Sequence, residues 1–104
     1  MKKVVTIAAS VVLMSVATSA FANGEKTYKA ACIACHSTGA AGSPKVGDKA
    51  AWVDRIKQDK NTLYEHAIKG FKGAKGFMPA KGGRTDLSDA DVKAAVDYMI
   101  AKSK

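Results

Sequence analysis

The run Cys32-Ile33-Ala34-Cys35-His36 constrains this chain more than any other feature of its sequence. Two thiols at this spacing, followed directly by a histidine, are typical of the covalent attachment site of a c-type haem. Each thiol bonds one vinyl group of the porphyrin, and the adjoining imidazole then lies beneath the iron. The motif therefore predicts one covalently attached haem c, with thioether bonds at Cys32 and Cys35 and with His36 as an iron ligand.

The two thiols also fit other kinds of site. A thioredoxin-like redox pair would need a strand before the motif, and no segment here alternates like a strand. A zinc site would need four ligands, and apart from the thiols only His36 and His66 are obvious candidates. We therefore favour haem attachment over a redox dithiol or a metal site.

The N-terminus has the three parts of an export signal. Two lysines precede an apolar stretch that runs to about Val16, and Ala20-Phe21-Ala22 forms a small-x-small cleavage site. An uncleaved membrane anchor is the alternative, but the stretch falls short of the ~20 apolar residues needed to span a bilayer. We therefore expect residues 1–22 to be a cleaved signal peptide and residues 23–104 to be one exported domain without a membrane span.

The expected mature domain is small. Removing 22 of the 104 residues leaves 82, and such a domain buries only ~60% of its unfolded surface, which makes it marginally stable without a cross-link or cofactor. Both cysteines lie inside the haem motif, so a long-range disulfide is impossible. The haem itself must therefore supply the missing part of the core.

The apolar spacing along the rest of the chain is helical, and glycine and proline cluster where helices should end. We expect helices at about residues 25–34, 49–58 and 62–69, and a glycine-rich loop over residues 37–47 that passes the His36 side of the haem. The sequence therefore predicts an all-α fold of four to five short helices around one haem.

The last helix has the clearest pattern. Ser88 is a typical N-cap, and the apolar positions that follow recur at helical spacing, namely Val92, Ala95, Val96, Met99 and Ile100. Gly24 and Tyr28 of the first helix offer a surface for this apolar stripe, because the glycine allows close approach. We expect the N- and C-terminal helices to cross, with Tyr28 packed against Tyr98.

A low-spin electron carrier needs a second axial iron ligand, and a thioether raises the reduction potential. Met78 and Met99 are the two methionines beyond the expected cleavage site. Met99 lies in the apolar stripe of the last helix, where methionine is usually core, whereas Met78 lies in a glycine-rich loop that can cover the distal face of the haem. We expect Met78 to be the ligand. His66 is the alternative, although a half-exposed surface position fits it better.

These features occur together in a known family. The haem motif is followed by further markers, namely Gly42-Ser43-Pro44-Lys45-Val46-Gly47-Asp48, Trp52 with Arg55, Met78-Pro79-Ala80-Lys81-Gly82-Gly83 and Leu87-Ser88-Asp89. Over nearly the whole mature chain the sequence resembles the small monohaem class I cytochromes c, most of all the cytochrome c5 group of bacterial periplasmic carriers. The resemblance implies the class I cytochrome c fold and a periplasmic location.

The resemblance also implies roles for single residues. His36 would be the proximal ligand and Met78 the distal ligand, and the Pro44 carbonyl would accept a hydrogen bond from the unligated ring nitrogen of His36. One feature departs from the family: some members carry a second cysteine pair before the last helix, and Arg84 and Leu87 occupy those positions here. The loop after Met78 therefore lacks a disulfide, and a looser distal loop is the expectation.

The haem propionates need hydrogen-bond donors, because burying either anion unpaired is costly. Trp52 offers an indole N–H and Arg55 a guanidinium about one helical turn further on, so the pair could hold one propionate. In the other interpretation, Trp52 belongs to the core and Arg55 is a solvated charge. The family resemblance favours the propionate contact.

The charge of the chain favours an acidic partner. Without Lys2 and Lys3 the formal net charge falls from +8 to +6. Four lysines flank the expected ligand loop, namely Lys69, Lys72, Lys75 and Lys81. Grouped near the haem edge, they would steer the protein toward an acidic docking surface, although lysines that only confer solubility are the alternative. Nucleic acid is not an expected partner outside the cytoplasm.

Taken with the resemblance, these features predict a periplasmic monohaem carrier of single electrons that is a monomer and not an enzyme. The family implies redox partners: a quinol-oxidising complex as donor, and a terminal oxidase or a cytochrome c peroxidase as acceptor. The alternative is a haem-based ligand sensor or minor peroxidase, in which Met78 is labile and His66 or Tyr64 serves an incoming ligand.

Overall fold

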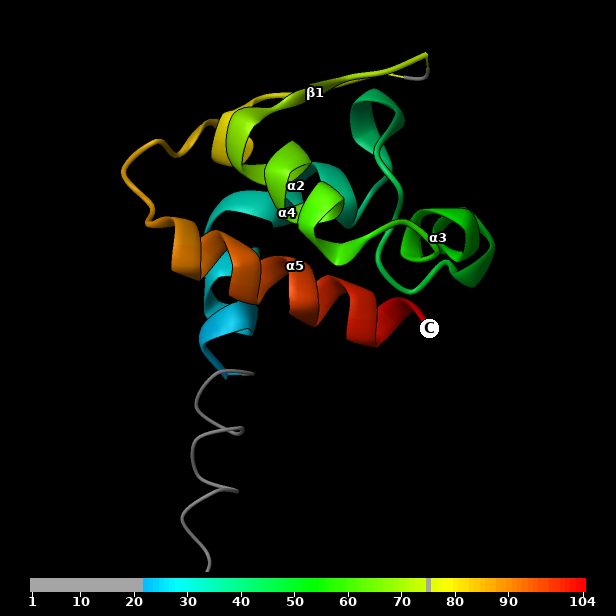
Figure 1. Ribbon diagram of the computed structural model, residues 1–104, viewed down its shortest axis with the longest axis horizontal. Helices are drawn as coiled ribbons and strands as arrows, with labels where there is room; N and C mark the ends of the chain where they lie inside the picture. The colour runs from blue at the N-terminus through cyan, green and yellow to red at the C-terminus, as the bar shows by residue number, and fades with distance from the viewer. Residues whose placement is uncertain (1–21, 75) are drawn as a thin grey trace, which may run out of the picture.

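The computed structural model describes residues 22–74 and 76–104 (Figure 1). The expected signal peptide falls outside these residues except for Ala22, and Lys75 also falls outside them. Within the described ranges, no helix is long and apolar enough to cross a membrane. The described part of the chain is mostly helical, with one short hairpin, which agrees with the predicted fold class.

The first helix carries the haem motif. Residues 22–27 are α-helical, and the helix continues through a π-helical segment, η1 (Tyr28–Cys32), into α2 (Ile33–His36). It ends two residues later than expected, because the first glycine after the motif is Gly39. Cys32 and His36 are four residues apart on one helix, so their side chains project from the same side.

Three longer α-helices follow: α3 (Lys49–Ile56), α4 (Lys60–Lys69) and α5 (Asp89–Ser103). Two short 3₁₀ segments, η2 (Ala40–Gly42) and η3 (Ala80–Gly83), lie in the loops between them. Side chains cap all three helices, with Asp48 accepting from the Ala51 N–H, Asp59 from Asn61 and Ser88 from Asp91. The predicted Ser88 cap is confirmed, and the Asp59 cap explains why α4 begins two residues earlier than expected.

The first helix crosses α5, as predicted (Figure 1). Gly24 lies against the backbone of Ala94, so closely that a Cβ at Gly24 would clash with the Ala94 carbonyl oxygen. The rings of Tyr28 and Tyr98 pack at a centroid distance of 5.4 Å with a tilt of 42°. The crossing therefore depends on a small residue for close approach and on an aromatic pair beside it.

The core is built around the apolar stripe of α5. Its buried members are Val92, Ala95, Val96, Tyr98, Met99 and Ile100, joined by Tyr28, Trp52 and Ala67 from other helices. Met99 is 5% exposed, which confirms its predicted place in the core. Helix α5 thus packs both against the first helix, which carries the haem motif, and against α4.

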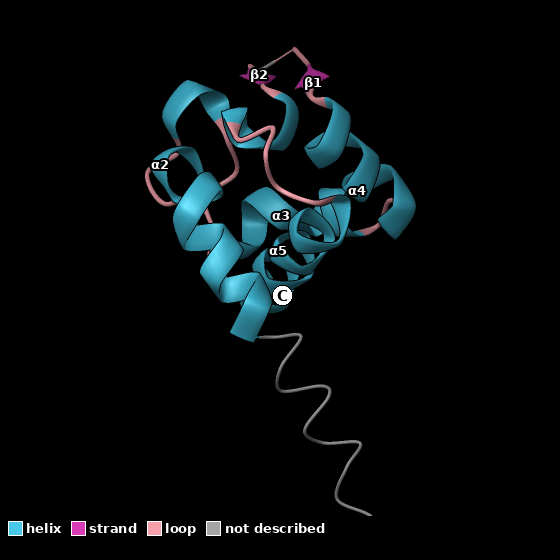
Figure 2. Cartoon of the chain, turned by 90° about the vertical axis from the view of Figure 1, so that its left-hand side faces the viewer, coloured by secondary structure: helices cyan, strands magenta, loops and turns pink. Residues whose placement is uncertain are grey.

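A small hairpin follows α4, and the sequence analysis did not predict it. Strands β1 (Phe71–Lys72) and β2 (Phe77–Met78) pair antiparallel, with Phe71 opposite Met78 and Lys72 opposite Phe77. Figure 2 shows the hairpin beyond the end of α4, at the top of the molecule. Strands of two residues are too short to show an alternating pattern, so the segment reads only as a glycine-rich loop.

Candidate haem site

The helices and the hairpin form a cavity of about 550 Å³. Its lining includes Cys32 and His36 from the first helix, Trp52 and Arg55 from α3, His66 from α4, Met78 from β2 and Met99 from α5. The volume lies within the range of about 300–1,000 Å³ that is usual for cofactor sites, and most of the lining surface is apolar. A cavity of this size, with a thiol, an imidazole and a thioether on its walls, fits a covalently attached porphyrin.

His36 is 8% exposed and lines the cavity. Its Nδ1 lies 2.8 Å from the Pro44 carbonyl oxygen, so the hydrogen bond implied by the family resemblance is present. Burial lowers the pKa of His36, and the charge of Arg55 lowers it further, against the opposing effect of the Pro44 hydrogen bond. The neutral ring must carry its proton on Nδ1 to donate to a carbonyl, which leaves the Nε2 lone pair free to bind a metal.

The proximal loop, which we define as residues 43–47, is held by three further hydrogen bonds. The Val46 N–H donates to the His36 carbonyl over 2.7 Å, and the Trp52 indole N–H donates to the Lys45 carbonyl over 2.9 Å. The Gly47 N–H donates to the Ser103 hydroxyl over 3.0 Å. The first helix, α3 and α5 therefore all contribute to placing the Pro44 carbonyl.

Ser103 was missed by the sequence analysis. It is 1% exposed, although it lies next to the C-terminus among lysines. Its spacing in the sequence indicated a buried position, since Ser103 continues the buried series Val92, Val96 and Met99 one helical turn further on.

Trp52 takes a different acceptor from the expected one. Its single indole N–H is used by the Lys45 carbonyl, so it is not directed at a propionate, and its ring is 5% exposed within the core. The core interpretation of Trp52 is therefore the one that the structure supports. Arg55 is half-buried and lines the cavity. One of its N–H groups donates to the Ala51 carbonyl, and its other N–H groups are candidates for binding a propionate.

The two cysteines are free thiols in the structure, with Cys32 lining the cavity and Cys35 half-buried outside its lining. Burial raises the pKa of Cys32 to about 11. Cysteines that exchange disulfides have lowered pKa values, because the thiolate is the reactive form. The environment of Cys32 therefore disfavours a redox dithiol. No group of three or more metal-binding side chains gathers among the residues that the structure describes, so a zinc site finds no support there either.

On the distal side, Met78 is half-buried in β2 and packs against the core. His66 also lines the cavity, and its ring lies 4.3 Å from that of Phe71. It lies three residues after Leu63 on the same face of α4, and it is half-buried, in agreement with the half-exposed position expected for it. The structure thus brings both predicted candidates for the sixth ligand, Met78 and His66, to one cavity.

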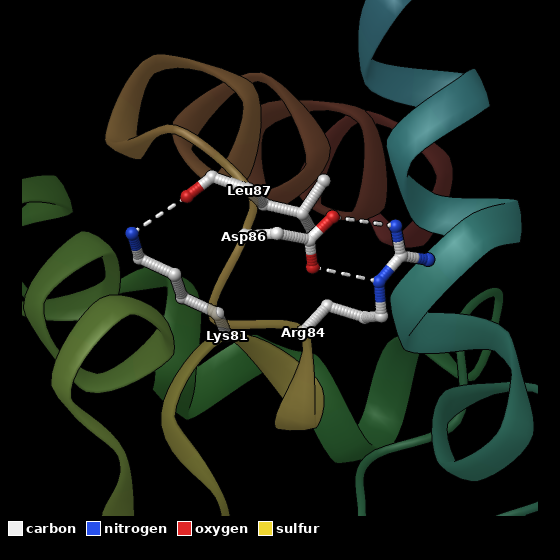
Figure 3. A network of polar contacts seen from close by, with 4 residues as sticks. All are labelled: Lys81, Arg84, Asp86 and Leu87. Atoms are coloured by element: carbon white, nitrogen blue, oxygen red, sulfur yellow. Dashed lines mark hydrogen bonds and ion pairs between the residues drawn. The ribbon is translucent and has the colours of Figure 1, made fainter.

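The distal loop, which we define as residues 79–87, is closed by polar contacts (Figure 3). Lys81 donates to the Leu87 carbonyl over 2.6 Å and pairs with the Asp89 carboxylate over 3.1 Å. Arg84 binds both carboxylate oxygens of Asp86 at 2.9 Å. Arg84 and Leu87, the positions at which the family resemblance would place a second cysteine pair, both take part in these contacts.

These contacts change the expectation for one member of the expected lysine cluster, Lys81. The ammonium group of Lys81 is turned toward the loop, because it is bound there. Lys69 pairs with Glu65 over 3.1 Å on α4, whereas Lys72 is exposed on β1. Lys75 lies outside the described residues, so a docking surface formed by the lysines other than Lys81 stays a prediction.

Comparison with known proteins finds matches among cytochromes. A family model described as cytochrome C oxidase, cbb3-type, subunit III matches residues 19–99. A cytochrome c-555 of Chlorobaculum tepidum is 59% identical over 83 residues, covering 80% of this chain and 77% of that protein. A cytochrome c5 of Azotobacter vinelandii is 38% identical over 79 residues, covering 74% of this chain and 90% of that protein.

Solved structures agree with the sequence matches. A chain from a crystal structure described as an electron transfer complex of nitrite reductase with cytochrome c superposes with a TM-score of 0.69 at 41% identity, covering 79% of this chain and 95% of that chain. A mono-haem ferrocytochrome c from Shewanella putrefaciens superposes with a TM-score of 0.62 at 37% identity, covering 78% and 94% of the two chains.

A small helical domain with a C-x-x-C-H motif beside a cavity of cofactor size defines a c-type cytochrome. The chain belongs to the cytochrome c family, as a small electron carrier with one covalently attached haem c. Its similarity to the cytochrome c-555 relative exceeds its similarity to the cytochrome c5 relative, which refines the group expected from the sequence.

Proposed function

We propose that Cys32 and Cys35 form the two thioether bonds, and that His36 and Met78 are the axial ligands of the iron. The observation that carries this assignment is the placement of His36: its Nδ1 is engaged by the Pro44 carbonyl, and its ring lines the cavity that Met78 also lines. The haem iron supplies one reversible electron step. The protein residues keep the iron in one coordination and exclude water from it.

The protein works as a periplasmic carrier of single electrons after residues 1–22 are removed, and it catalyses no bond chemistry. Two strong axial ligands leave no open position for a substrate, which supports a carrier over an enzyme. Its donor is a quinol-oxidising complex and its acceptor a terminal oxidase or a peroxidase, and the carrier acts as a monomer. These partner classes follow from the family.

The partner surface is acidic. A net charge of +6 after loss of Lys2 and Lys3 supports steering toward such a surface. The solved relative described in an electron transfer complex with nitrite reductase supports docking onto a redox enzyme. Association should therefore slow as salt is added.

A second candidate function is ligand sensing or weak peroxidase activity. Its support is His66, which lines the cavity and contacts Phe71, the residue paired with Met78 in the hairpin. If Met78 leaves the iron, an imidazole is available on that side for a bound ligand.

The test uses holoprotein made in cells that attach haem c. The carrier assignment predicts an N-terminus at Asn23, one haem bonded through Cys32 and Cys35, and a ferrous spectrum that carbon monoxide does not change at neutral pH. A ferrous spectrum that shifts at once with carbon monoxide would favour the sensor. A colourless protein with two unmodified thiols would refute the haem assignment.

A further inference from the structure

Lys81 is the least exposed of the lysines that form ion pairs. Its side chain is 18% exposed, whereas those of the other ion-paired lysines are 57–73% exposed. It lies three residues after Met78, and its ammonium group binds the Leu87 carbonyl (Figure 3). The same ammonium group pairs with the Asp89 carboxylate. Lys81 therefore joins the beginning of the distal loop to its end and to the first residue of α5.

The backbone at Lys81 is strained. Its φ is 54°, in the left-handed region that residues with a Cβ rarely adopt, and Gly82 follows with a φ of 64°. Gly82 fits so closely against the Ala31 carbonyl that a Cβ at this position would clash with it, so the turn lies directly against the helix before Cys32. Such a turn persists only where surrounding contacts hold it. Backbone hydrogen bonds from Gly82 to Pro79 and from Arg84 to Lys81 hold the turn locally, and the side chain of Lys81 bonds it to the end of the loop and to α5.

The second ion pair of the distal loop, between Arg84 and Asp86, supports the loop less than the contacts of Lys81 do. Arg84 and Asp86 are two residues apart within one turn, with side chains 47% and 67% exposed. An exposed pair contributes little, and this one connects the loop to no other element. Lys81 provides the better shielded contact, and it reaches α5.

We propose that Lys81 is a positioning residue for the distal ligand. By joining the two ends of the distal loop, it keeps β2 and Met78 turned toward the cavity. The proposal rests on the proposed role of Met78 as an iron ligand. It assigns Lys81 a role inside the protein, in place of the docking role that its charge suggested. The contacts of Lys81 lie in the segment where the family resemblance would place a disulfide.

The test compares ferric and ferrous holoproteins. Lys81→Met keeps the unbranched stem and the left-handed backbone but removes the donor. We expect its methionine–iron absorption band to weaken and its rate of carbon monoxide binding to rise at least tenfold over the native rate. Lys81→Arg should show the native absorption band and the native rate of carbon monoxide binding, because it keeps the charge and the donors. Lys72→Met, which removes the same charge from an exposed lysine of the hairpin, should match the native protein.

Met78→Ala separates this proposal from the ligand assignment. If the native protein already binds carbon monoxide freely, or if Met78→Ala leaves the band intact, Met78 is not the ligand and both proposals fail. If Met78→Ala is reactive while Lys81→Met stays as inert as the native protein, the positioning role alone is overturned. If Lys81→Met yields no holoprotein, Lys81→Gln decides: faster binding supports the role, and a native rate refutes it.

Discussion

The proximal loop and the distal loop flank the same cavity but are held in different ways. In the proximal loop, four hydrogen bonds of 2.7–3.0 Å involve backbone groups, and their partners come from the first helix, α3 and α5. In the distal loop, three backbone hydrogen bonds run within the loop itself, and the side chain of Lys81 bonds it to Asp89 of α5. The proximal loop is therefore bonded to three helices, whereas the hydrogen bonds of the distal loop lie mostly within it.

This difference suggests how the two ligands are maintained. His36 is oriented by contacts that exist without any bond to iron, because Pro44 is fixed by its neighbours. Met78 is placed by its pairing with Phe71, by packing against the core and by the loop that follows it, so we expect the iron bond and the distal loop to stabilise one another. We therefore expect changes on the distal side to alter haem chemistry first, and changes on the proximal side to alter stability first.

The largest effect is expected from Met78→Ala, which removes the proposed distal ligand and leaves every proximal contact in place. The reduction potential should fall by roughly 100 mV or more, within the ~0.8 V range that axial ligands span. The ferrous protein should also begin to bind carbon monoxide. A redox titration that returned the native potential would show that Met78 does not bind the iron.

Met99→Ala is the matched control, because it truncates the other methionine of the mature chain. Met99 is buried in α5, so its loss should reduce the free energy of unfolding by about 2–5 kcal/mol. The potential should stay close to the native value, since Met99 belongs to the core. Denaturant unfolding and a redox titration check the two expectations, and loss of the methionine–iron band in this variant would reverse the assignment.

Ser103→Ala tests the proximal side. The Gly47 N–H would lose its acceptor, which should cost about 1–3 kcal/mol of stability. Weaker support of Pro44 should also raise the potential slightly, because a less strongly hydrogen-bonded His36 donates less electron density to the iron. Ser37→Ala, at an exposed position, should change stability by less than about 0.5 kcal/mol. Equal effects of the two variants would show that the buried contact does not matter.

Arg84→Gln should have the smallest effect, because the Arg84–Asp86 pair is exposed. The hydrogen bond from Arg84 lowers the pKa of Asp86 below its ordinary value of 3.8. Because the pKa of Asp86 is lower in the folded state, the pair stabilises the protein at pH values above 3.8. This stabilisation is lost as the pH falls through the lowered pKa of the folded protein. Thermal unfolding at pH 7 should show little difference, and the two proteins should converge in acid. A large loss of stability at pH 7 would mean that this pair, rather than Lys81, holds the distal loop.

Features that a short stretch of sequence determines were predicted correctly. The haem motif, the Ser88 cap and the stripe of α5 each depend on residues within a few positions of one another. The helix crossing was also predicted correctly, with Gly24 and Tyr28 of the first helix against the apolar stripe of α5. The sequence pattern therefore sufficed for the fold class and for the presence of one covalently attached haem.

Features that depend on distant partners were not predictable. The acceptor of the Trp52 N–H is the backbone of the proximal loop, and a sequence does not reveal that a carbonyl will lie there. Lys81 was expected at the surface because lysine usually is, and its inward position follows from a left-handed turn that brings Leu87 within reach. Ser103 could have been found by extending the helical spacing of α5 to its last turn.

The proton NMR spectrum of the ferrous holoprotein tests the axial assignment most directly, because the ring current of haem shifts the methyl group of a bound methionine far upfield. We predict one such methyl signal, which disappears in Met78→Ala and persists in Met99→Ala. A spectrum without a shifted methionine methyl, or one in which the signal is lost with Met99 instead, would contradict the proposed coordination by His36 and Met78.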